Sequence, residues 1–426
     1  MKKTIGIISL GCPRNLVDSE NIVSEFLKKG YSFDKDSLHS ATLIINTCAF
    51  IEDAKRESID AVLKAIDAKK DGNVKKIIVA GCLSERYGAE LRKELKEVDE
   101  FRGVRDFNGR NNNVEEGLKP SPTRLTPAHY AYIKISEGCA NRCAYCVIPY
   151  LKGNYKSRPL GSIKKEAAGL VKNGAKEIIL IGQDTSLYGV DLYGKRMLPD
   201  LLKELAGISR DIWIRLLYLH PANLDKEVIR IIRDNDNICK YIDLPLEHIN
   251  DKILSRMARK ISRKRIISLI EHIRKELPGG AIRTSFITGF PGETEKEFRE
   301  LASFVKEMKF ERLGVFKYSR EEGTPACDYK NQVSEKEKQK RFDALMSAQQ
   351  SVSREANKRL IGRTLKVLVE EKGDGFYLAR TEYDAPEIDG LVYVKGKKMK
   401  TGNFYNVKIQ DAYEYDLTGY AVERLL

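Results

Sequence analysis

The sequence has no long hydrophobic run and contains few cysteines. No apolar stretch in its 426 residues approaches the roughly 20 residues that a transmembrane helix needs, so we expect no membrane partner. The apolar run at residues 5–10 follows two lysines but is too short for a secretory signal, and we predict a strand there and a cytoplasmic protein. Eight cysteines are too sparse for a disulfide scaffold, so in a reducing compartment they indicate metal ligands and a few ordinary thiols.

The overall composition fits a globular protein of several domains. Apolar residues make up 42% of the chain and charged residues 32%, which allows a substantial core. The length suits about three domains. The formal net charge of +14 favours nucleic acid, or a particle rich in nucleic acid, as a partner.

Three of the cysteines stand close together at the spacing C-x3-C-x2-C: Cys139, Cys143 and Cys146. Residues 132–135 alternate apolar and polar side chains, so we predict that the cysteines lie on a loop at the end of a strand. No fourth cysteine or histidine is nearby, whereas a structural zinc site has four ligands. A four-iron cluster held by three thiolates keeps one iron open for another ligand. The alternatives are a zinc knuckle or three unrelated core thiols.

The first 119 residues predict a small parallel α/β domain. Predicted strands at residues 4–10, 42–46 and 76–80 alternate with helical patterns at residues 19–29 and 52–69. Each strand is followed by a cysteine: Cys12, Cys48 and Cys82. Parallel strand ends converge on one edge of a sheet, so these thiols can meet and form a second cluster site with an open iron. The alternative for each is a small buried apolar residue.

Two further domains are expected after a linker. Residues 108–127 are rich in Asn and Pro and predict the linker. Six strand–helix units follow, and they predict a partial (β/α)6 barrel of the TIM type with its chemistry at the carboxyl ends of the strands. The predicted strands are at residues 132–135, 177–181, 212–217, 241–244, 282–287 and 313–318. After a charged helix at residues 334–359, five short alternating runs predict a small antiparallel barrel of the oligonucleotide-binding kind.

The cysteine loop resembles the signature of the radical SAM enzymes, in which S-adenosylmethionine chelates the open iron and is cleaved to a 5′-deoxyadenosyl radical. With both cysteine sets, the whole chain resembles the methylthiotransferases. That resemblance implies an auxiliary-cluster domain at residues 1–119, a radical SAM core at 125–357 and a TRAM domain at 358–426. It also implies two [4Fe-4S] clusters, with Cys139, Cys143 and Cys146 holding the radical-generating one and Cys12, Cys48 and Cys82 the one that carries the transferred sulfur. The hard chemistry would belong to these cofactors.

Two branches of that family act on different substrates. One modifies isopentenyl-adenosine in tRNA; the other modifies the β-carbon of an aspartate in ribosomal protein S-twelve, and several stretches resemble the second, among them residues 9–20, 217–221 and 385–390. From residue 361 onward, ten Lys and Arg stand against eleven Asp and Glu, a net charge of −1, whereas a tRNA-binding domain needs a basic face. We therefore expect the ribosomal-protein branch, with the tRNA enzyme and a non-enzymatic two-cluster electron carrier as alternatives. The expected partners are ribosomal protein S-twelve or the small subunit, and a flavodoxin or ferredoxin as reductant, with the enzyme a monomer.

The resemblance implies positions for the SAM contacts. Tyr145 would meet the adenine, Gln183 and Asp184 the amino end, and Arg215 the carboxylate, while Gly289 allows close backbone approach. Glu247 departs from the family, which usually has glutamine there, and receives no role. Cys239 and Cys327 match no motif and are predicted to be ordinary thiols. A basic run could contact ribosomal RNA, although a solvated helix face is the alternative that we favour; it comprises Arg256, Arg259, Lys260, Arg263, Lys264 and Arg265.

Overall fold

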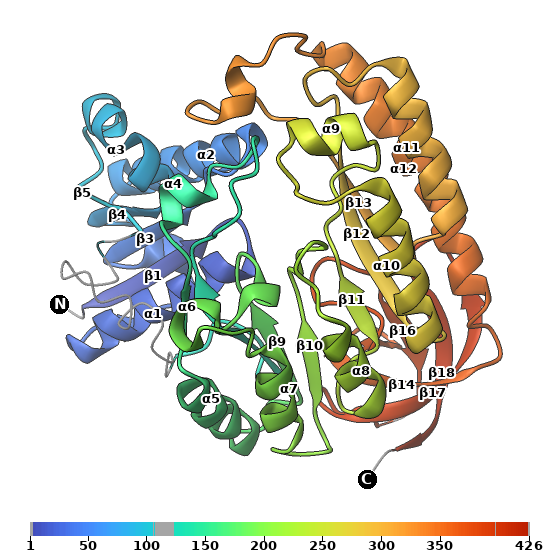
Figure 1. The fold of residues 1–426 in the computed structure, drawn as a ribbon. Helices are drawn as coiled ribbons and strands as arrows, with labels where there is room; N and C mark the ends of the chain where they lie inside the picture. The colour runs from blue at the N-terminus through green and yellow to red at the C-terminus, as the bar shows by residue number, and fades with distance from the viewer. Residues whose placement is uncertain (1–2, 105, 107–122, 397, 425–426) are drawn as a thin grey trace.

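The computed structural model describes residues 3–104, 106, 123–396 and 398–424 (Figure 1). Three parts follow one another along the chain: an α/β part, a central part whose strands are surrounded by helices, and a small barrel at the carboxyl end. The predicted fold class is therefore confirmed. Most of the predicted linker, residues 108–122, lies outside the described residues.

The first part is a five-stranded parallel sheet in the order β2-β1-β3-β4-β5. The three predicted strands are β1, β3 and β4, and they are neighbours in the sheet. The helix predicted from residue 19 begins six residues earlier, because proline is tolerated in the first turn of a helix. The elements are β1 (Thr4–Ser9), α1 (Pro13–Lys28), β2 (Ser32–Phe33), η1 (Ser37–His39), β3 (Thr42–Thr47), α2 (Glu52–Lys70), β4 (Lys76–Gly81), α3 (Cys82–Glu94) and β5 (Glu100–Arg102).

The central part contains all six predicted strands, arranged as two parallel three-stranded sheets in the orders β10-β9-β6 and β11-β12-β13. An isolated parallel bridge between Ile214 and Ile238 lies where the two sheets adjoin. The strands are β6 (Tyr130–Lys134), β9 (Glu177–Ile181), β10 (Trp213–Leu216), β11 (Tyr241–Asp243), β12 (Ala281–Thr288) and β13 (Arg312–Lys317), with the short pair β7 (Ser136–Glu137) and β8 (Lys156–Ser157) beside them.

Helices pack around these strands and bury a continuous apolar core. Figure 1 shows the long α12 running beside α11 toward the last domain. The helices are α4 (Ile148–Lys152), α5 (Leu160–Lys172), η2 (Thr185–Leu187), α6 (Val190–Tyr193), α7 (Leu198–Ala206), α8 (Lys226–Asp234), α9 (Asp251–Arg256), α10 (Arg263–Glu276), α11 (Glu295–Met308), η3 (Pro325–Asp328) and α12 (Glu335–Lys358).

The last part is a closed five-stranded barrel in the order β14-β15-β16-β18-β17. Its strands are β14 (Thr364–Lys372), β15 (Tyr377–Thr381), β16 (Val392–Lys395), β17 (Phe404–Ala412) and β18 (Leu417–Arg424). The prediction of a wholly antiparallel barrel was wrong at one pairing, because β16 and β18 run parallel. A strand that closes a barrel pairs with whichever edge remains open, and the alternation of side chains within a strand does not encode that direction.

Buried ion pairs join the last barrel to the central part. Glu177, at the start of β9, accepts hydrogen bonds from Arg215 Nε at 2.6 Å and from Arg380 Nη2 at 2.5 Å. All three side chains are at most 1% exposed. Arg215 also donates to the carbonyl oxygen of Glu382 at 2.8 Å. The interface is thus built around buried side chains of opposite charge.

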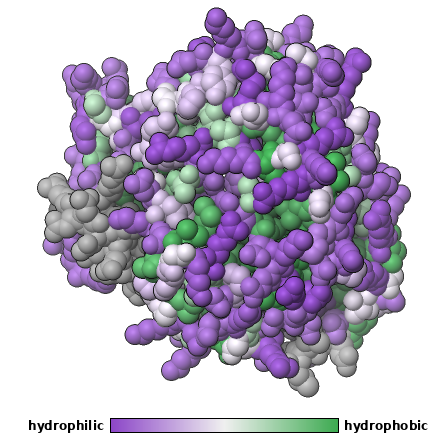
Figure 2. Space-filling model, viewed as in Figure 1, coloured by the Kyte–Doolittle hydropathy of each residue, from purple (hydrophilic) through white to green (hydrophobic). Residues whose placement is uncertain are grey.

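The outer surface is mainly polar. Figure 2 shows hydrophilic residues over most of the face in view, with apolar residues showing mainly near its centre. Within the described parts of the chain, no helix is both long and apolar enough to cross a membrane.

Candidate active site

The loop with Cys139, Cys143 and Cys146 lies between β7 and α4, close to the carboxyl end of β6. Gly138 begins the loop with φ +75°, and a Cβ there would lie 2.2 Å from the carbonyl oxygen of Asn154, so only glycine fits. Burial raises the pKa of Cys139 to about 11 and that of Cys146 to about 12. The loop therefore holds thiols whose charged form needs a compensating cation or metal.

The other three cysteines follow neighbouring strands of the first sheet. Cys12 lies just past β1, Cys48 directly follows β3, and Cys82 directly follows β4. They lie close enough for the charges of Cys82 and Cys12 to act on Cys48, whose pKa is raised to about 12, first by burial and then by these neighbours. A Cβ on Gly11 would lie 3.0 Å from Cys48 Sγ, which shows how tightly the first two loops pack. The predicted convergence of the strand ends is thus present in the geometry.

Cys12 differs from the other thiols of its set. Burial alone would raise its pKa, but the charge of Arg14 and a hydrogen bond from Arg14 Nε, at 3.4 Å from Sγ, bring the pKa below its usual value. The charge of Lys152 acts in the same direction. Arg14 and Lys152 therefore favour the charged form of Cys12, which is the form that ligates iron.

Arg14 joins the two cysteine sets. Its Nη1 donates to the carbonyl oxygen of Gly182, just past β9, at 3.2 Å, and its guanidinium carbon lies 4.4 Å from the ring centre of Tyr218, just past β10. Burial raises the pKa of both Cys48, in one set, and Cys146, in the other, and the charge of Arg14 partly opposes that rise in each. The first domain thus places the Arg14 guanidinium at the ends of β9 and β10 in the central part, between the two groups of thiols.

A second group of charges closes the same region. Lys152 Nζ lies 2.8 Å from Asp18 Oδ2, and Lys134 Nζ contacts both Asp18 and Glu137. Gln183 Nε2 donates to Glu137 Oε1 at 2.6 Å. Two lysines and two carboxylates neutralise one another here, and they fasten the first domain to the barrel beside the cysteine loop.

The donor sets fit iron–sulfur clusters better than single ions. Among the described residues, no three His, Cys, Asp or Glu side chains lie close enough to share one metal ion. A zinc ion would need four donors within about 2.0–2.3 Å of one point. Three thiols spread over one loop, as in Cys139, Cys143 and Cys146, or over the ends of neighbouring strands, as in Cys12, Cys48 and Cys82, suit a larger cluster held by thiolates.

Four of the five predicted SAM contacts lie around the cysteine loop. Asp184 is buried and accepts hydrogen bonds from Asn141 in the loop at 2.7 Å and from Asn223 at 2.9 Å. Gln183 is held by Glu137, as described above. Tyr145 packs edge-on against Phe290, with ring centres 6.5 Å apart, and Phe290 directly follows Gly289. Arg215 is not among them, because its guanidinium is engaged by Glu177 and Glu382 at the interface with the last domain.

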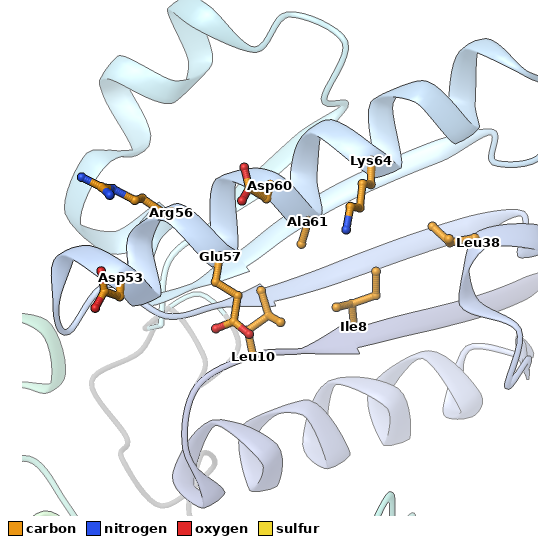
Figure 3. A pocket seen from close by; sticks show the side chains of 9 residues that line it. All are labelled: Ile8, Leu10, Leu38, Asp53, Arg56, Glu57, Asp60, Ala61 and Lys64. Atoms are coloured by element: carbon orange, nitrogen blue, oxygen red, sulfur yellow. The ribbon is translucent and has the colours of Figure 1, made fainter. Parts of the chain in front are cut away.

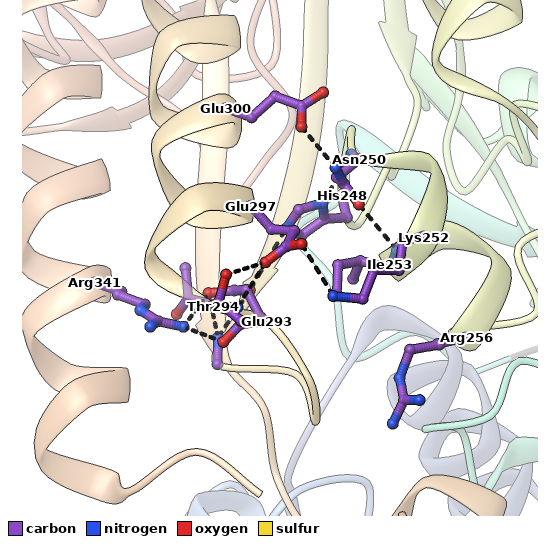
Figure 4. Close-up of polar contacts among 12 residues, drawn as sticks. His248, Asn250, Lys252, Ile253, Arg256, Glu293, Thr294, Glu297, Glu300 and Arg341 are labelled. Carbon is purple, nitrogen blue, oxygen red and sulfur yellow. Dashed lines mark hydrogen bonds and ion pairs between the residues drawn. The ribbon is translucent and has the colours of Figure 1, made fainter. Parts of the chain in front are cut away.

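Buried charges support the turn that begins at Gly289 (Figure 4). Glu293 accepts the Gly289 N–H at 3.1 Å and a hydrogen bond from Arg341 of α12 at 2.7 Å. His248 Nε2 lies 3.5 Å from Glu293 Oε2. Glu293 thus holds the turn through its contacts with Gly289, Arg341 and His248. Gly289 itself has φ +73°.

Three residues that matter in the geometry were given no role from the sequence. Arg14 and Tyr218 stood inside motifs used for the family resemblance, which was their only signal. Arg259 was assigned to a solvated helix face, and for this residue that interpretation was wrong: it is 5% exposed and its Nη1 lies 3.6 Å from Cys143 Sγ. The backbone at Ala258 and Lys260 adopts positive φ, so no regular helix carries Arg259, and periodicity could not place it.

A surface pocket of about 550 Å³ lies elsewhere, between β1 and α2 (Figure 3). Its walls combine the apolar Ile8, Leu10 and Leu38 with charged side chains of α2, such as Asp53 and Glu57. None of the six cysteines lines it, so it is separate from the candidate site.

Comparison with known families assigns the three parts of the chain. Residues 133–305 match the radical SAM superfamily, residues 361–422 the TRAM domain, and residues 4–103 the "Uncharacterized protein family UPF0004". Among solved structures, the radical SAM methyltransferase TsrM from Kitasatospora setae matches with a TM-score of 0.52 and 15% identity, over 89% of this chain and 81% of that one, which is a likeness of fold. The chain is thus a radical SAM protein that carries a TRAM domain.

Curated relatives narrow the family. The ribosomal protein uS12 methylthiotransferase RimO of Thermoanaerobacter sp. (strain X514) is 48% identical over 98% of this chain and 99% of its own length. The RimO protein of Bacteroides fragilis (strain ATCC 25285) is 44% identical over 98% and 99%. The chain belongs to the RimO family of radical SAM methylthiotransferases, whose cofactors include an iron–sulfur cluster and SAM. The predicted ribosomal-protein branch is confirmed, and neither alternative is favoured.

Proposed function

We propose that this enzyme methylthiolates the β-carbon of an aspartate in ribosomal protein uS12, and that it uses two [4Fe-4S] clusters. Cys139, Cys143 and Cys146 would hold the cluster that binds SAM, and Cys12, Cys48 and Cys82 the second cluster. The observation that carries this proposal is the presence of two separate sets of three thiols, linked across the domain boundary by Arg14. When bound, these cofactors supply the electron, the radical chemistry and the sulfur.

The chain's own residues would position and shield that chemistry. Asn141 and Asp184 fix the cysteine loop against the end of β9, and Glu137 orients Gln183. The Gly289 turn, held by Glu293, offers backbone close to Tyr145 for the adenosyl part of SAM. Asp18, Lys134 and Lys152 are largely buried, and their ion pairs hold the two domains together. Arg215 is left out of the proposed SAM contacts because of its place at the other interface.

The proposal extends to organisation and partners. Residues 1–119, 125–357 and 358–426 would be the three domains, which the separate sheets support. A flavodoxin or ferredoxin would supply electrons in the cytoplasm to a monomeric enzyme.

Reaction of the anaerobically reconstituted enzyme with SAM, a reductant and recombinant uS12 tests this function. Mass spectrometry should find a methylthio group on one aspartate of uS12, together with 5′-deoxyadenosine. Cys139→Ala should abolish both products. Cys48→Ala should still form 5′-deoxyadenosine but transfer no methylthio group, because only the second cluster is lost.

A deletion strain separates the alternatives. We expect its uS12 to lack the methylthio group while its tRNA nucleosides stay modified. Loss of the modification from tRNA alone would favour the tRNA enzyme. An enzyme that forms no 5′-deoxyadenosine under reducing conditions would be an electron carrier.

A further inference from the structure

Arg14 is a half-buried cation with no carboxylate partner. Among the described residues, no Asp or Glu oxygen lies within 4.0 Å of its guanidinium, although Asp18, one turn further along α1, is paired with two lysines. Charged side chains with so little exposure are normally paired. Arg14 thus contacts a thiol, Cys12, and lacks the directly bonded carboxylate that usually accompanies a cation with so little exposure.

The guanidinium also keeps free donors. Nε faces Cys12 Sγ and Nη1 faces the carbonyl oxygen of Gly182. Nη2 makes no hydrogen bond within the described part of the protein, while a guanidinium has five N–H donors in a planar fork. That fork matches the geometry of a carboxylate, which it can bind through two parallel hydrogen bonds.

The position of this fork is fixed in advance. Its plane is supported by the ring of Tyr218, 4.4 Å away, and Tyr218 has φ +61°, a strained backbone for a bulky residue. The Tyr218 N–H is held by Asp243 Oδ2 at 2.8 Å. Strain kept in place by its surroundings is common at binding sites, and here it sets the ring beneath the cation.

The nearby cations do not compete for the same role. Lys134 and Lys152 are both engaged by Asp18, and Lys134 also by Glu137, so their charges are neutralised locally. Arg259, beside Cys143, is buried and donates to the carbonyl oxygen of Pro245. Of these four, Arg14 alone comes from the first domain, and it contacts residues just past both β9 and β10.

We infer that Arg14 binds the side-chain carboxylate of the substrate aspartate and so holds its β-carbon between the two cysteine sets. This inference rests on the proposed function, since it assigns the acidic substrate of that reaction to one residue. A β-carbon lies one bond from the carboxylate, so a bidentate contact fixes its direction. The residue that selects aspartate is thus supplied by the first domain, while SAM is bound by the second.

Binding of uS12 and of its Asp→Asn variant at the modified position tests the inference. Holoenzymes of the wild type, Arg14→Gln, Arg14→Lys and Arg56→Gln are compared anaerobically by calorimetry, with iron content and 5′-deoxyadenosine formation measured on each. Arg56 is the control, because it is an exposed arginine of the same domain, paired only with Glu52 at 3.4 Å. The wild type and Arg56→Gln should bind the aspartate form about 10- to 100-fold tighter than the asparagine form, as expected for a charge-assisted pair.

In Arg14→Gln the two affinities should become nearly equal while iron content stays at the wild-type level. An arginine that only balances the charge of a cluster would change the cluster's EPR signal or potential and leave the preference for aspartate intact, which would overturn the inference. If Arg14→Gln loses iron, Arg14→Lys decides, since it keeps the charge but cannot make two parallel hydrogen bonds: the preference for aspartate should fall, and an unchanged preference overturns the bidentate contact. If the wild type fails to modify uS12 at all, the proposed function itself is wrong.

Discussion

Replacing Glu177 by glutamine should weaken the junction between the barrel and the last domain. Its carboxylate is fully buried and bonded to both Arg215 and Arg380, and their charges hold its pKa below the usual range although burial acts to raise it. Glutamine keeps the shape but loses the charge, and its amide would direct a donor at a guanidinium. Breaking a buried pair by neutralising one partner costs about 3–5 kcal/mol.

The structure divides that cost unequally. Arg380 would retain Glu370, 2.6 Å away, whereas Arg215 would retain only the carbonyl oxygen of Glu382. We therefore expect the lower end, about 3 kcal/mol, which corresponds to exchange about 100-fold faster for amides that open with the interface. Hydrogen exchange of β9 and β15, followed by mass spectrometry, measures this directly.

The matched control is Glu204→Gln on α7. Glu204 is also paired with a cation, Lys164 at 2.6 Å, but both side chains are about half exposed, so the change should cost less than about 1 kcal/mol. Exchange in β9 and β15 that is no faster in Glu177→Gln than in Glu204→Gln would refute the reasoning about buried charge.

Three other changes have expected outcomes. Burial, reinforced by the charge of Glu166, raises the pKa of Glu20 to about 7, so its stabilising contribution is present in acid and lost as pH rises through 7. The free energy of unfolding of Glu20→Gln, measured in urea titrations, should therefore rise relative to the wild type by up to about 3 kcal/mol between pH 5 and 8. A difference that stays constant over this pH range would contradict the prediction. Gly138→Ala should reduce bound iron from about eight to about four per chain, while Gly169→Ala, which has open space around it, should leave iron unchanged. Glu293→Gln should weaken SAM binding about tenfold by releasing the Gly289 N–H and Arg341, with the exposed Glu295→Gln as control; equal affinities would show that the turn needs no such support.

Strand–helix alternation was enough to predict the order of domains and the six barrel strands. It worked because apolar runs of five or six residues, separated by helical patterns, have few other ways to pack. The two-residue β2 and three-residue β5 were missed, since such short segments carry no measurable period. The parallel pairing of β16 with β18 depends on barrel closure and has no local signal.

The candidate site was predictable where its chemistry follows from the type of residue, and less predictable where it depends on the direction in which a side chain points. Six cysteines at strand ends are recognisable in the sequence, and the structure places one set on the loop before α4 and the other after the neighbouring strands β1, β3 and β4. Arg215 follows the same strand-end logic, yet its side chain points toward Glu177 and the last domain, because an alternating strand offers two faces and the sequence does not say which faces the substrate. Arg14 reaches across a domain boundary to Gly182, 168 positions away, a contact that no local pattern encodes.

The central claim is that the chain holds two clusters, each bound by one set of three cysteines. Iron analysis of two triple variants tests this claim most directly. After anaerobic reconstitution, the wild type should contain about eight irons per chain, and the Cys12/Cys48/Cys82→Ala and Cys139/Cys143/Cys146→Ala variants about four each. The EPR signals of the two variants should add up to that of the wild type. A wild type with about four irons, or one triple variant that keeps the full content, would contradict the account.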